Sequence, residues 1–224
     1  MLRPPSIVVD AISQIKSPIS PPAIFWPTIL AFDCADSADS TRFPDLSAIL
    51  ARDGADVAEP LTSFVKAACS AQKRILVLDD FLFRPKENQA LQIRLDQVLK
   101  WLPLNIAAKD VRFLTKQLAT KSDEANLADK ISEHAELINL YLPPGSAPIS
   151  IQVRFTLARN FDYVHDRFAI IDDELWHFGA TVGGLHHQVN AATRGWPAEQ
   201  HHADLFFETA WAAEGKVGKR GRRA

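Results

Sequence analysis

Short apolar runs alternate along this chain with longer segments in which apolar residues recur every three to four positions. The runs are rich in β-branched and aromatic residues, which is typical of buried or half-buried strands; they lie at 75–83, 110–118 and 149–157. The longer segments have the spacing of amphipathic helices; they lie at 59–72, 89–102 and 122–138. This alternation predicts an α/β protein with a layered sheet.

The last strand pair of this sheet is predicted within the stretch 163–182, YVHDRFAIIDDELWHFGATV. It contains the apolar runs FAIID and LWHFGA, and Asp173-Glu174 between them can turn the chain, because aspartate at a corner bonds its own backbone. A segment rich in Gly, His and Asn follows at 183–203 and is typical of a loop. The apolar segment 203–213 then closes the domain as a helix or a strand.

Both ends of the chain differ from this main domain, which we place at 45–215. Residues 1–44 form a Pro-rich, apolar N-terminal appendage, in which IFWPTILAF is typical of a short strand broken by Pro27. We expect the appendage either to pack over the main domain or to dock a partner protein. Residues 216–224 form a basic C-terminal tail with glycines that favour flexibility.

The composition is that of a globular protein, with 224 residues of which 47% are apolar and 23% are charged. A formal net charge of −2 gives no global attraction to nucleic acid, so a basic footprint must be local. Cys34 and Cys69 are too few for a metal site or a disulfide framework. The sequence has no bilayer-length apolar run and no signal-peptide pattern, which predicts a cytoplasmic protein without a transmembrane segment.

Three polar residues interrupt the apolar stretch 163–182 and are the candidates for chemistry: His165, Arg167 and Asp172. Residues two apart in a strand point to the same face, so His165 and Arg167 are predicted to lie side by side. An imidazole and a guanidinium placed in this way can together grip a phosphate group. Asp172 is predicted to orient a histidine by hydrogen bonding, as carboxylates do for catalytic imidazoles.

This stretch resembles the active-site motif of the phospholipase D superfamily, which reads His, any, Lys, four residues, Asp, six residues, Gly-Ser, any, Asn. The same spacing is kept here by His165, Arg167, Asp172, Gly179, Ala180 and Val182. The Lys, the Ser and the Asn of the family motif are therefore replaced by Arg, Ala and Val. The form with Arg is similar to a divergent branch that includes bacterial proteins and the membrane-binding domain of a eukaryotic MIT-domain protein.

The resemblance implies a mixed sheet flanked by helices and a metal-independent phosphodiesterase, a nuclease acting on DNA or RNA. In that family a histidine attacks phosphorus, a phosphohistidine forms, and a second histidine from another motif copy protonates the leaving oxygen. His165 would be the nucleophile and Arg167 the phosphate clamp. This chain has one motif copy, so such an enzyme would act as a homodimer. The resemblance implies no cofactor and no metal.

Further residues are candidates for contacts with phosphate or nucleic acid. Arg154 precedes the motif within the strand 149–157, and Thr181 adjoins the replaced serine, although in a strand it would face away. The basic tail would attract a polyanion; its candidate residues are Lys219, Arg220, Arg222 and Arg223. The histidine pairs at 186–187 and 201–202 are poor metal candidates, because adjacent residues of a strand face opposite ways.

Because Ala180 and Val182 replace the Ser and the Asn of the family motif, a second interpretation is also possible. Removing one such donor costs roughly 3–4 kcal/mol of transition-state stabilisation. The chain would then be a catalytically degenerate phospholipase D-like module, a scaffold that binds nucleic acid, phospholipid headgroups or a partner protein. Both interpretations require that the imidazole of His165 and the guanidinium of Arg167 share one open, anion-accepting pocket at the edge of the sheet.

Overall fold

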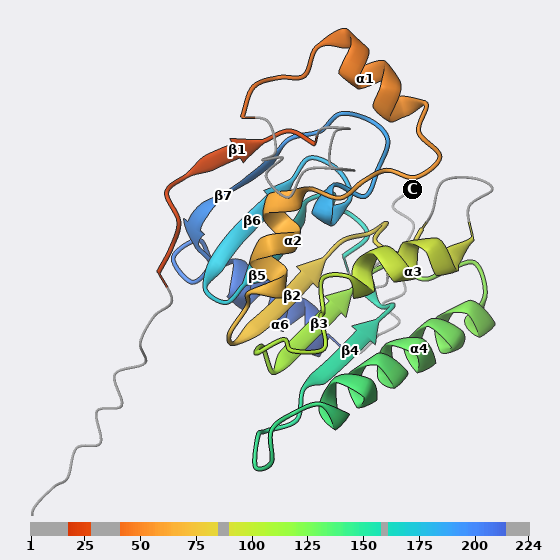
Figure 1. The fold of residues 1–224 in the computed structure, drawn as a ribbon, viewed down its shortest axis with the longest axis vertical. Coiled ribbons are helices and arrows are strands. Elements are labelled where there is room, and N and C mark those ends of the chain that lie inside the picture. Colours follow the sequence, from red (N-terminus) through yellow and green to blue (C-terminus); the bar gives the residue numbers. More distant parts are fainter. Residues whose placement is uncertain (1–17, 28–40, 85–89, 158–160, 214–224) are drawn as a thin grey trace, which may run out of the picture.

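A computed structural model describes residues 18–27, 41–84, 90–157 and 161–213 of the chain (Figure 1). The helices are α1 (Leu46–Asp53), α2 (Thr62–Cys69), α3 (Leu91–Leu99), α4 (Lys121–Leu140) and α6 (Ala203–Ala212), with a short 3-10 helix, η2, at Val182–Gly184. The strands are β1 (Ala23–Phe25), β2 (Arg74–Leu78), β3 (Asp110–Leu114), β4 (Ser150–Arg154), β5 (Arg167–Ile171), β6 (Glu174–Phe178) and β7 (Ala192–Pro197). The predicted α/β class is confirmed.

The seven strands form one mixed sheet in the order β1-β7-β6-β5-β2-β3-β4. Strands β2, β3 and β4 are parallel, whereas β5, β6, β7 and β1 run antiparallel to their neighbours. Strand β5 lies beside β2, so that Leu78 at the end of β2 pairs with Phe168 near the start of β5. The carboxyl ends of β2 and β3 therefore meet the start of β5 at one edge, which is where open α/β sheets commonly bind ligands.

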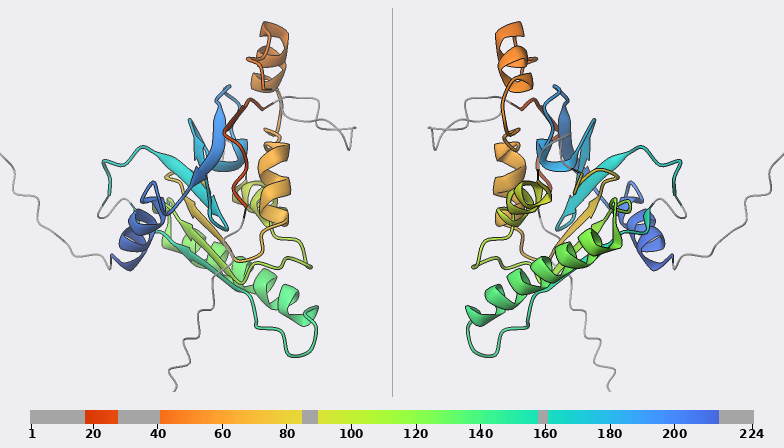
Figure 2. Two further views of the ribbon diagram at one scale, coloured as in Figure 1. Left: turned by 90° about the vertical axis from the view of Figure 1, so that its left-hand side faces the viewer. Right: turned by 90° about the vertical axis from the view of Figure 1, so that its right-hand side faces the viewer.

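Helices cover both faces of the sheet (Figure 2). Along β2 the buried side chains alternate between two cores: Ile75 and Val77 face the core that includes residues of α2, α3 and α4. Leu76 and Leu78 face the smaller core that includes residues of α6. Burial on both faces explains why this strand is an uninterrupted apolar run rather than an alternating one.

The ends of the elements follow local chemistry. Asp45 caps α1, because its carboxylate accepts a hydrogen bond from the Ala48 N–H at 2.8 Å, and the helix ends at Gly54. Helix α4 begins at Lys121, with Thr120 as its N-cap, whereas the sequence suggests Ser122 as the cap. Strand β2 stops at Leu78, well before the predicted end of the apolar run. The shortened strand creates the turn on which the site described below is built.

The segment 183–203 was predicted to be a loop, and that prediction is wrong for β7 at 192–197, which joins β6 to β1. Glycine and proline within this strand weaken its sequence signal. Strand β1 lies within the predicted N-terminal appendage, and its Phe25 is only 8% exposed and stacks on Trp176 with ring centroids 6.0 Å apart. Part of the predicted appendage thus forms the edge of the main sheet.

Candidate anion-binding site

A pocket of about 340 Å³ opens at the edge where the carboxyl end of β2 meets the start of β5. Its walls come from the turn after β2, from α3, from the first residue of β5 and from the loop after β6. The residues that line it are Phe81, Arg84, Arg94, Arg167, Ala180, Thr181, Leu185, His186, His187 and Gln188. None of these described lining residues is acidic, and three are arginines, so we call this site the arginine pocket.

Arg167 is the first residue of β5 and reaches this pocket from the sheet edge. Its Nε lies 3.7 Å from Oδ1 of Asp79, and its guanidinium carbon lies 4.8 Å from the centre of the Phe81 ring. The Nε atom is buried and has no hydrogen-bond partner among the described residues. The guanidinium makes no hydrogen bond to any described residue, and the Arg167 side chain is 18% exposed. Its terminal N–H groups are therefore available to an anionic ligand.

Asp79 lies behind Arg167 and holds two segments of the pocket wall together. Its carboxylate is fully buried and accepts hydrogen bonds of 2.7 Å from the backbone N–H groups of Phe81 and Val182. Burial raises the pKa of Asp79 to about 6, and these N–H donors and the nearby arginines oppose the rise. The bond to Phe81 turns the chain at the end of β2. The bond to Val182 ties that turn to the loop after β6, so one side chain joins two walls of the pocket.

Arg94 enters the pocket from α3 and is almost fully buried, at 5% exposure. Its Nη1 lies 3.5 Å from the Leu82 carbonyl, which is a long hydrogen bond, and its Nε has no hydrogen-bond partner in the described part of the chain. Burial lowers the pKa of Arg94 to about 10, while Asp79 acts in the opposite direction. Arg94 is still cationic at neutral pH, so the protein holds a buried positive charge that no carboxylate of the described residues hydrogen-bonds.

The ring of Phe81 organises the cations at the pocket mouth. The guanidinium carbon of Arg84 lies 5.5 Å from the ring centre, on a side chain that also donates a hydrogen bond of 2.7 Å to the Gln117 carbonyl. The Nζ of Lys116 lies at the same distance from the ring and forms an ion pair with the buried Asp80. Contacts of cations with an aromatic face are attractive, so this one ring gathers Arg84, Lys116 and Arg167.

Two adjacent histidines line the other side of the pocket. His187 is buried, and its Nε2 lies 2.9 Å from the Ala55 carbonyl. Burial, together with the positive charge of Arg52, lowers the pKa of His186 to about 4. Arg52 donates hydrogen bonds to the carbonyls of Gly184 and His186 at 2.6 and 2.8 Å, which holds this loop against the body. His186 is therefore neutral at pH 7, and the positive charge of the pocket comes from its arginines.

His165 does not share this pocket. It is exposed, lies two residues before the start of β5, and makes no hydrogen bond to any described residue. The predicted side-by-side arrangement with Arg167 assumed that the strand includes both residues. Because β5 begins at Arg167, the alternation of a strand does not extend back to His165, and only Arg167 lines the pocket.

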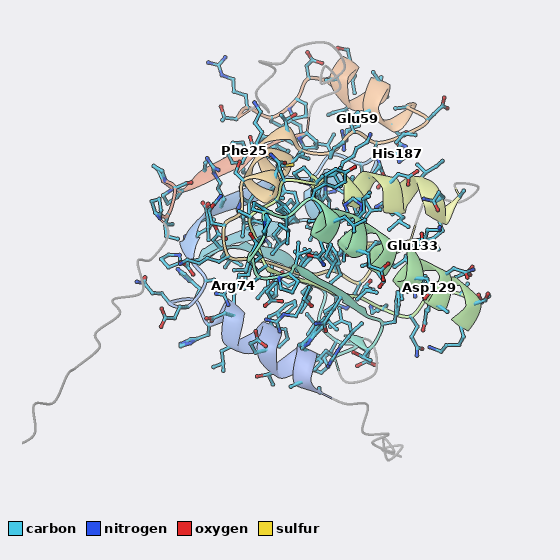
Figure 3. The ribbon with its side chains drawn as sticks, turned by 60° about the horizontal axis from the view of Figure 1, so that its bottom comes forward. Phe25, Glu59, Arg74, Asp129, Glu133 and His187 are labelled. Atoms are coloured by element: carbon cyan, nitrogen blue, oxygen red, sulfur yellow. The ribbon has the colours of Figure 1, made fainter. Side chains whose placement is uncertain are left out.

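Asp172 lies at the opposite end of β5, separated from His165 by the length of the strand. It occupies the turn between β5 and β6 with φ 55°, and its carboxylate accepts hydrogen bonds from the backbone N–H groups of Gln72, Lys73 and Arg74. Figure 3 labels Arg74, which hydrogen-bonds Asp172, and His187, which lines the arginine pocket. The three predicted catalytic residues are thus not brought together within one chain.

The remaining predicted contacts are divided among several places. Thr181 lines the arginine pocket, because β6 ends at Phe178 and the chain is no longer a strand at Thr181. Arg154 lies elsewhere: it donates a hydrogen bond to the Trp211 carbonyl and stacks on the Trp211 ring, with its guanidinium carbon 4.5 Å from the ring centre. The tail residues Lys219, Arg220, Arg222 and Arg223 lie outside the described residues.

Sequence reasoning missed Arg84 and Arg94 as site residues. One signal was present: Arg94 falls between Leu91, Leu95 and Val98 on the apolar face of its helix, where a solvated arginine is not expected. Arg84 carried no such signal, because an arginine before a proline at the end of an apolar run is ordinary at a surface.

A second pocket of about 350 Å³ lies between α6 and the β5–β6 hairpin, lined in part by Phe168, Leu175 and Phe206. At its rim the Nε2 of His177 lies 2.8 Å from Oδ1 of Asp166. Across the described ranges, the His, Cys, Asp and Glu side chains form no group of three or more suited to a metal ion. No described helix is long and apolar enough to cross a membrane.

No family model matches this chain, and no curated protein matches it. TrmBL2, an archaeal chromatin protein with "a novel mode of DNA binding", aligns over 69% of this chain and 49% of its own, with 12% identity and a TM-score of 0.39. The phosphatidylserine synthase of Haemophilus influenzae Rd KW20 aligns over 72% of this chain and 38% of its own, with 19% identity and a TM-score of 0.39. The chain thus spans about half or less of these two proteins. A similarity this weak carries no argument about function. An argument about function must therefore rest on the side chains of this chain.

Proposed function

We propose that this chain is a phospholipase D-like domain that binds the phosphate groups of nucleic acid in the arginine pocket. The observation that supports this most is the gathering of Arg84, Arg94 and Arg167 around one cavity that no described acidic residue lines. Phosphate is the anion that guanidinium groups bind with matched, bidentate geometry. The degenerate-module interpretation fits this pocket better than the phosphohistidine interpretation, because His165 is not among its lining residues.

The strength of the interaction follows from burial. Arg94 and Arg167 are largely removed from water, so a phosphate oxygen that bonds them replaces little hydration and meets donors already in place. A hydrogen bond to a charged group contributes about 1.5–3 kcal/mol. Asp79 lies behind Arg167 without competing for the pocket side of its guanidinium. Nucleic acid is preferred as the ligand because the sequence ends in a basic tail that would attract a polyanion.

The first experiment measures binding of fluorescently labelled single-stranded DNA and RNA at fixed salt. Arg167→Ala removes the donors at the sheet edge, and we expect roughly a 10- to 100-fold loss of affinity, the equivalent of one or two charged hydrogen bonds. Arg167→Lys keeps the charge without the fork and is expected to fall between these two proteins. The matched control is Lys130→Ala, which removes an exposed cation on α4. Equal affinities for Arg167→Ala and the control would refute the proposal.

A metal-independent phosphodiesterase acting through a phosphohistidine in a homodimer is the second candidate. The observation that favours it is that His165 is exposed and makes no hydrogen bond to a described residue, so it is open to a substrate or to a second copy of the chain. Incubation with DNA and RNA in excess chelator tests it. Cleavage that His165→Ala abolishes, in a protein that is dimeric in solution, would establish the enzyme; binding without cleavage supports the module.

A further inference from the structure

We infer that the arginine pocket selects a terminal phosphate monoester, such as the phosphorylated end of a nucleic acid strand, over an internal phosphodiester. This inference rests on the proposed function and specifies which phosphate the site takes. An internal diester carries one negative charge, whereas a terminal monoester carries close to two at neutral pH. The charges built into the pocket distinguish these two ligands.

The charge balance leaves a surplus that one diester does not neutralise. Arg84, Arg94 and Arg167 bring three positive charges to the pocket wall. Asp79, behind Arg167, brings at most one negative charge. The neighbouring Lys116 forms an ion pair with Asp80, so this pair adds nothing to the balance. Among the described residues of this wall, two positive charges remain, which matches a dianion.

Burial of the arginines strengthens their interaction with the second negative charge of a monoester. Arg94 is 5% exposed, and the Nε atoms of Arg94 and Arg167 are both buried without a hydrogen-bond partner among the residues that the structure describes. Interactions between charges weaken much less inside a protein than in water, so a second ligand charge gains more here than it would at an exposed arginine.

The size of the cavity agrees with an end group. About 340 Å³ lies at the small end of the range for ligand pockets, enough for one phosphate with a small substituent but not for a run of nucleotides. Thr181 and His186 also line it, and each offers one more polar group to the phosphate or its ester oxygen. A strand end can place its last phosphate in such a site without passing the chain through it.

The experiment compares two small probes of nearly the same size, methyl phosphate and dimethyl phosphate, by calorimetric titration of the full chain at pH 7.5. We expect methyl phosphate to bind at least ten times more tightly. In a second arm, oligonucleotides with a 5′-phosphate, a 3′-phosphate or only hydroxyl ends compete for the same site, and a phosphorylated end is expected to win by a similar factor. Arg84→Ala, at an exposed position, removes one surplus charge and should reduce the preference to a few-fold.

The outcomes separate this inference from the proposed function. Equal affinities for the two esters, both lost in Arg167→Ala, would overturn the inference and leave the phosphate-binding pocket in place. Probe and oligonucleotide binding that ignores Arg167 would overturn both. Vesicles that contain phosphatidic acid present the same monoester on a lipid. Binding to these vesicles but not to phosphorylated oligonucleotides would assign the pocket to a membrane and overturn the nucleic acid end as ligand.

Discussion

Asp79 and Asp172 show how one residue type serves two opposite ends of the sheet. Each carboxylate accepts backbone N–H groups, Asp79 beyond the carboxyl end of β2 and Asp172 at its amino end. Only Asp79 faces a cation that lines the arginine pocket. A buried carboxylate next to Arg167 holds the guanidinium in position without a direct hydrogen bond, which leaves the terminal donors for a ligand.

The titration of His186 and Asp79 predicts a pH dependence of stability in which two terms oppose each other. The pKa of His186 is lowered by burial to about 4, so between pH 6.5 and 4 the unfolded chain binds more protons and this residue destabilises the fold as pH falls. The pKa of Asp79 is raised by burial from 3.8 to about 6, so over nearly the same range the folded chain binds more protons and stability rises as pH falls. The two contributions nearly cancel in the natural chain.

Replacing one member of the pair should reveal the other. In His186→Gln the histidine term is gone, and the free energy of unfolding should rise relative to the natural chain by about 2–3 kcal/mol between pH 7 and pH 4, at ~1.4 kcal/mol per pH unit. Urea unfolding read by the fluorescence of the buried Trp101 and Trp176 measures it. A difference between the two proteins that does not change with pH would show that the titration of His186 is not its cause.

The sequence identified Arg167 as an anion-binding candidate but mislocated its companion. The motif spacing pointed to both His165 and Arg167, and strand alternation placed them side by side. That rule applies only within a strand, and β5 starts at Arg167. The arginines that do share the pocket, Arg84 and Arg94, come from segments with no motif. Their meeting depends on how α3 packs on the sheet, which no local pattern encodes.

The turn of the β5–β6 hairpin is fixed to the start of β2 by the structural contacts of Asp172. Asp172 occupies the left-handed region with φ 55°, which aspartate tolerates better than most residues, and its carboxylate binds three consecutive N–H groups at the start of β2. Arg74 returns a hydrogen bond of 2.8 Å from its Nε to the Asp172 carbonyl. These contacts set the register in which β5 presents Arg167 at the far edge.

Asp172→Ala therefore tests a structural role against a catalytic one. The variant loses the acceptor of three backbone donors and puts alanine at a positive φ, so we expect the free energy of unfolding to fall by about 2–3 kcal/mol. Asp172→Asn keeps one acceptor oxygen and tolerates the turn, so its loss should be smaller. Affinity for methyl phosphate should change less than twofold in both variants.

The neighbouring residue supplies the control for this hairpin. Asp173 forms an exposed ion pair with Lys73 at 2.7 Å, and its removal in Asp173→Ala should cost less than ~1 kcal/mol. Chemical denaturation of the three variants and of the natural chain gives the comparison. A stable Asp172→Ala protein that has lost phosphate binding or cleavage would place this carboxylate in the site instead.

At the scale of elements, strands buried on both faces were the easiest to predict and the edge strands the hardest. The run at β2 stood out because four buried residues, two facing each core, are all apolar. Strand β7 was missed because Gly195 and Pro197 interrupt it and three of its six residues contribute little apolar surface. Its place depends on pairing with β6, the preceding strand, and with β1, which is far away in the sequence.

For the molecule as a whole, the arginine pocket is a product of topology. Its walls come from segments near residues 81–84, 94, 167 and 180–188, which the sheet order brings to one edge. Composition gives no hint of this concentration, because the chain as a whole carries a formal net charge of −2. The positive charge needed to bind an anion is local, and it is strong there because the fold buries Arg94 and leaves the Arg167 side chain only 18% exposed.

The same topology makes the N-terminal strand part of the domain, and this has a measurable consequence. Phe25 of β1 is 8% exposed and packs on Trp176, whereas its neighbour Ile24 points outward and is 42% exposed. Phe25→Ala should lower the free energy of unfolding by about 2–4 kcal/mol, while Ile24→Ala on the same strand should cost less than ~1 kcal/mol. Denaturation followed by tryptophan fluorescence reports both, because the ring of Trp176 contacts Phe25 directly.

The alternative is that the residues before 45 form an arm that docks a partner and that the sheet is complete without this arm. In that case the two variants would be equally stable. A large difference between them requires that β1 contribute to the core on which β6, and through it the position of Arg167, depends.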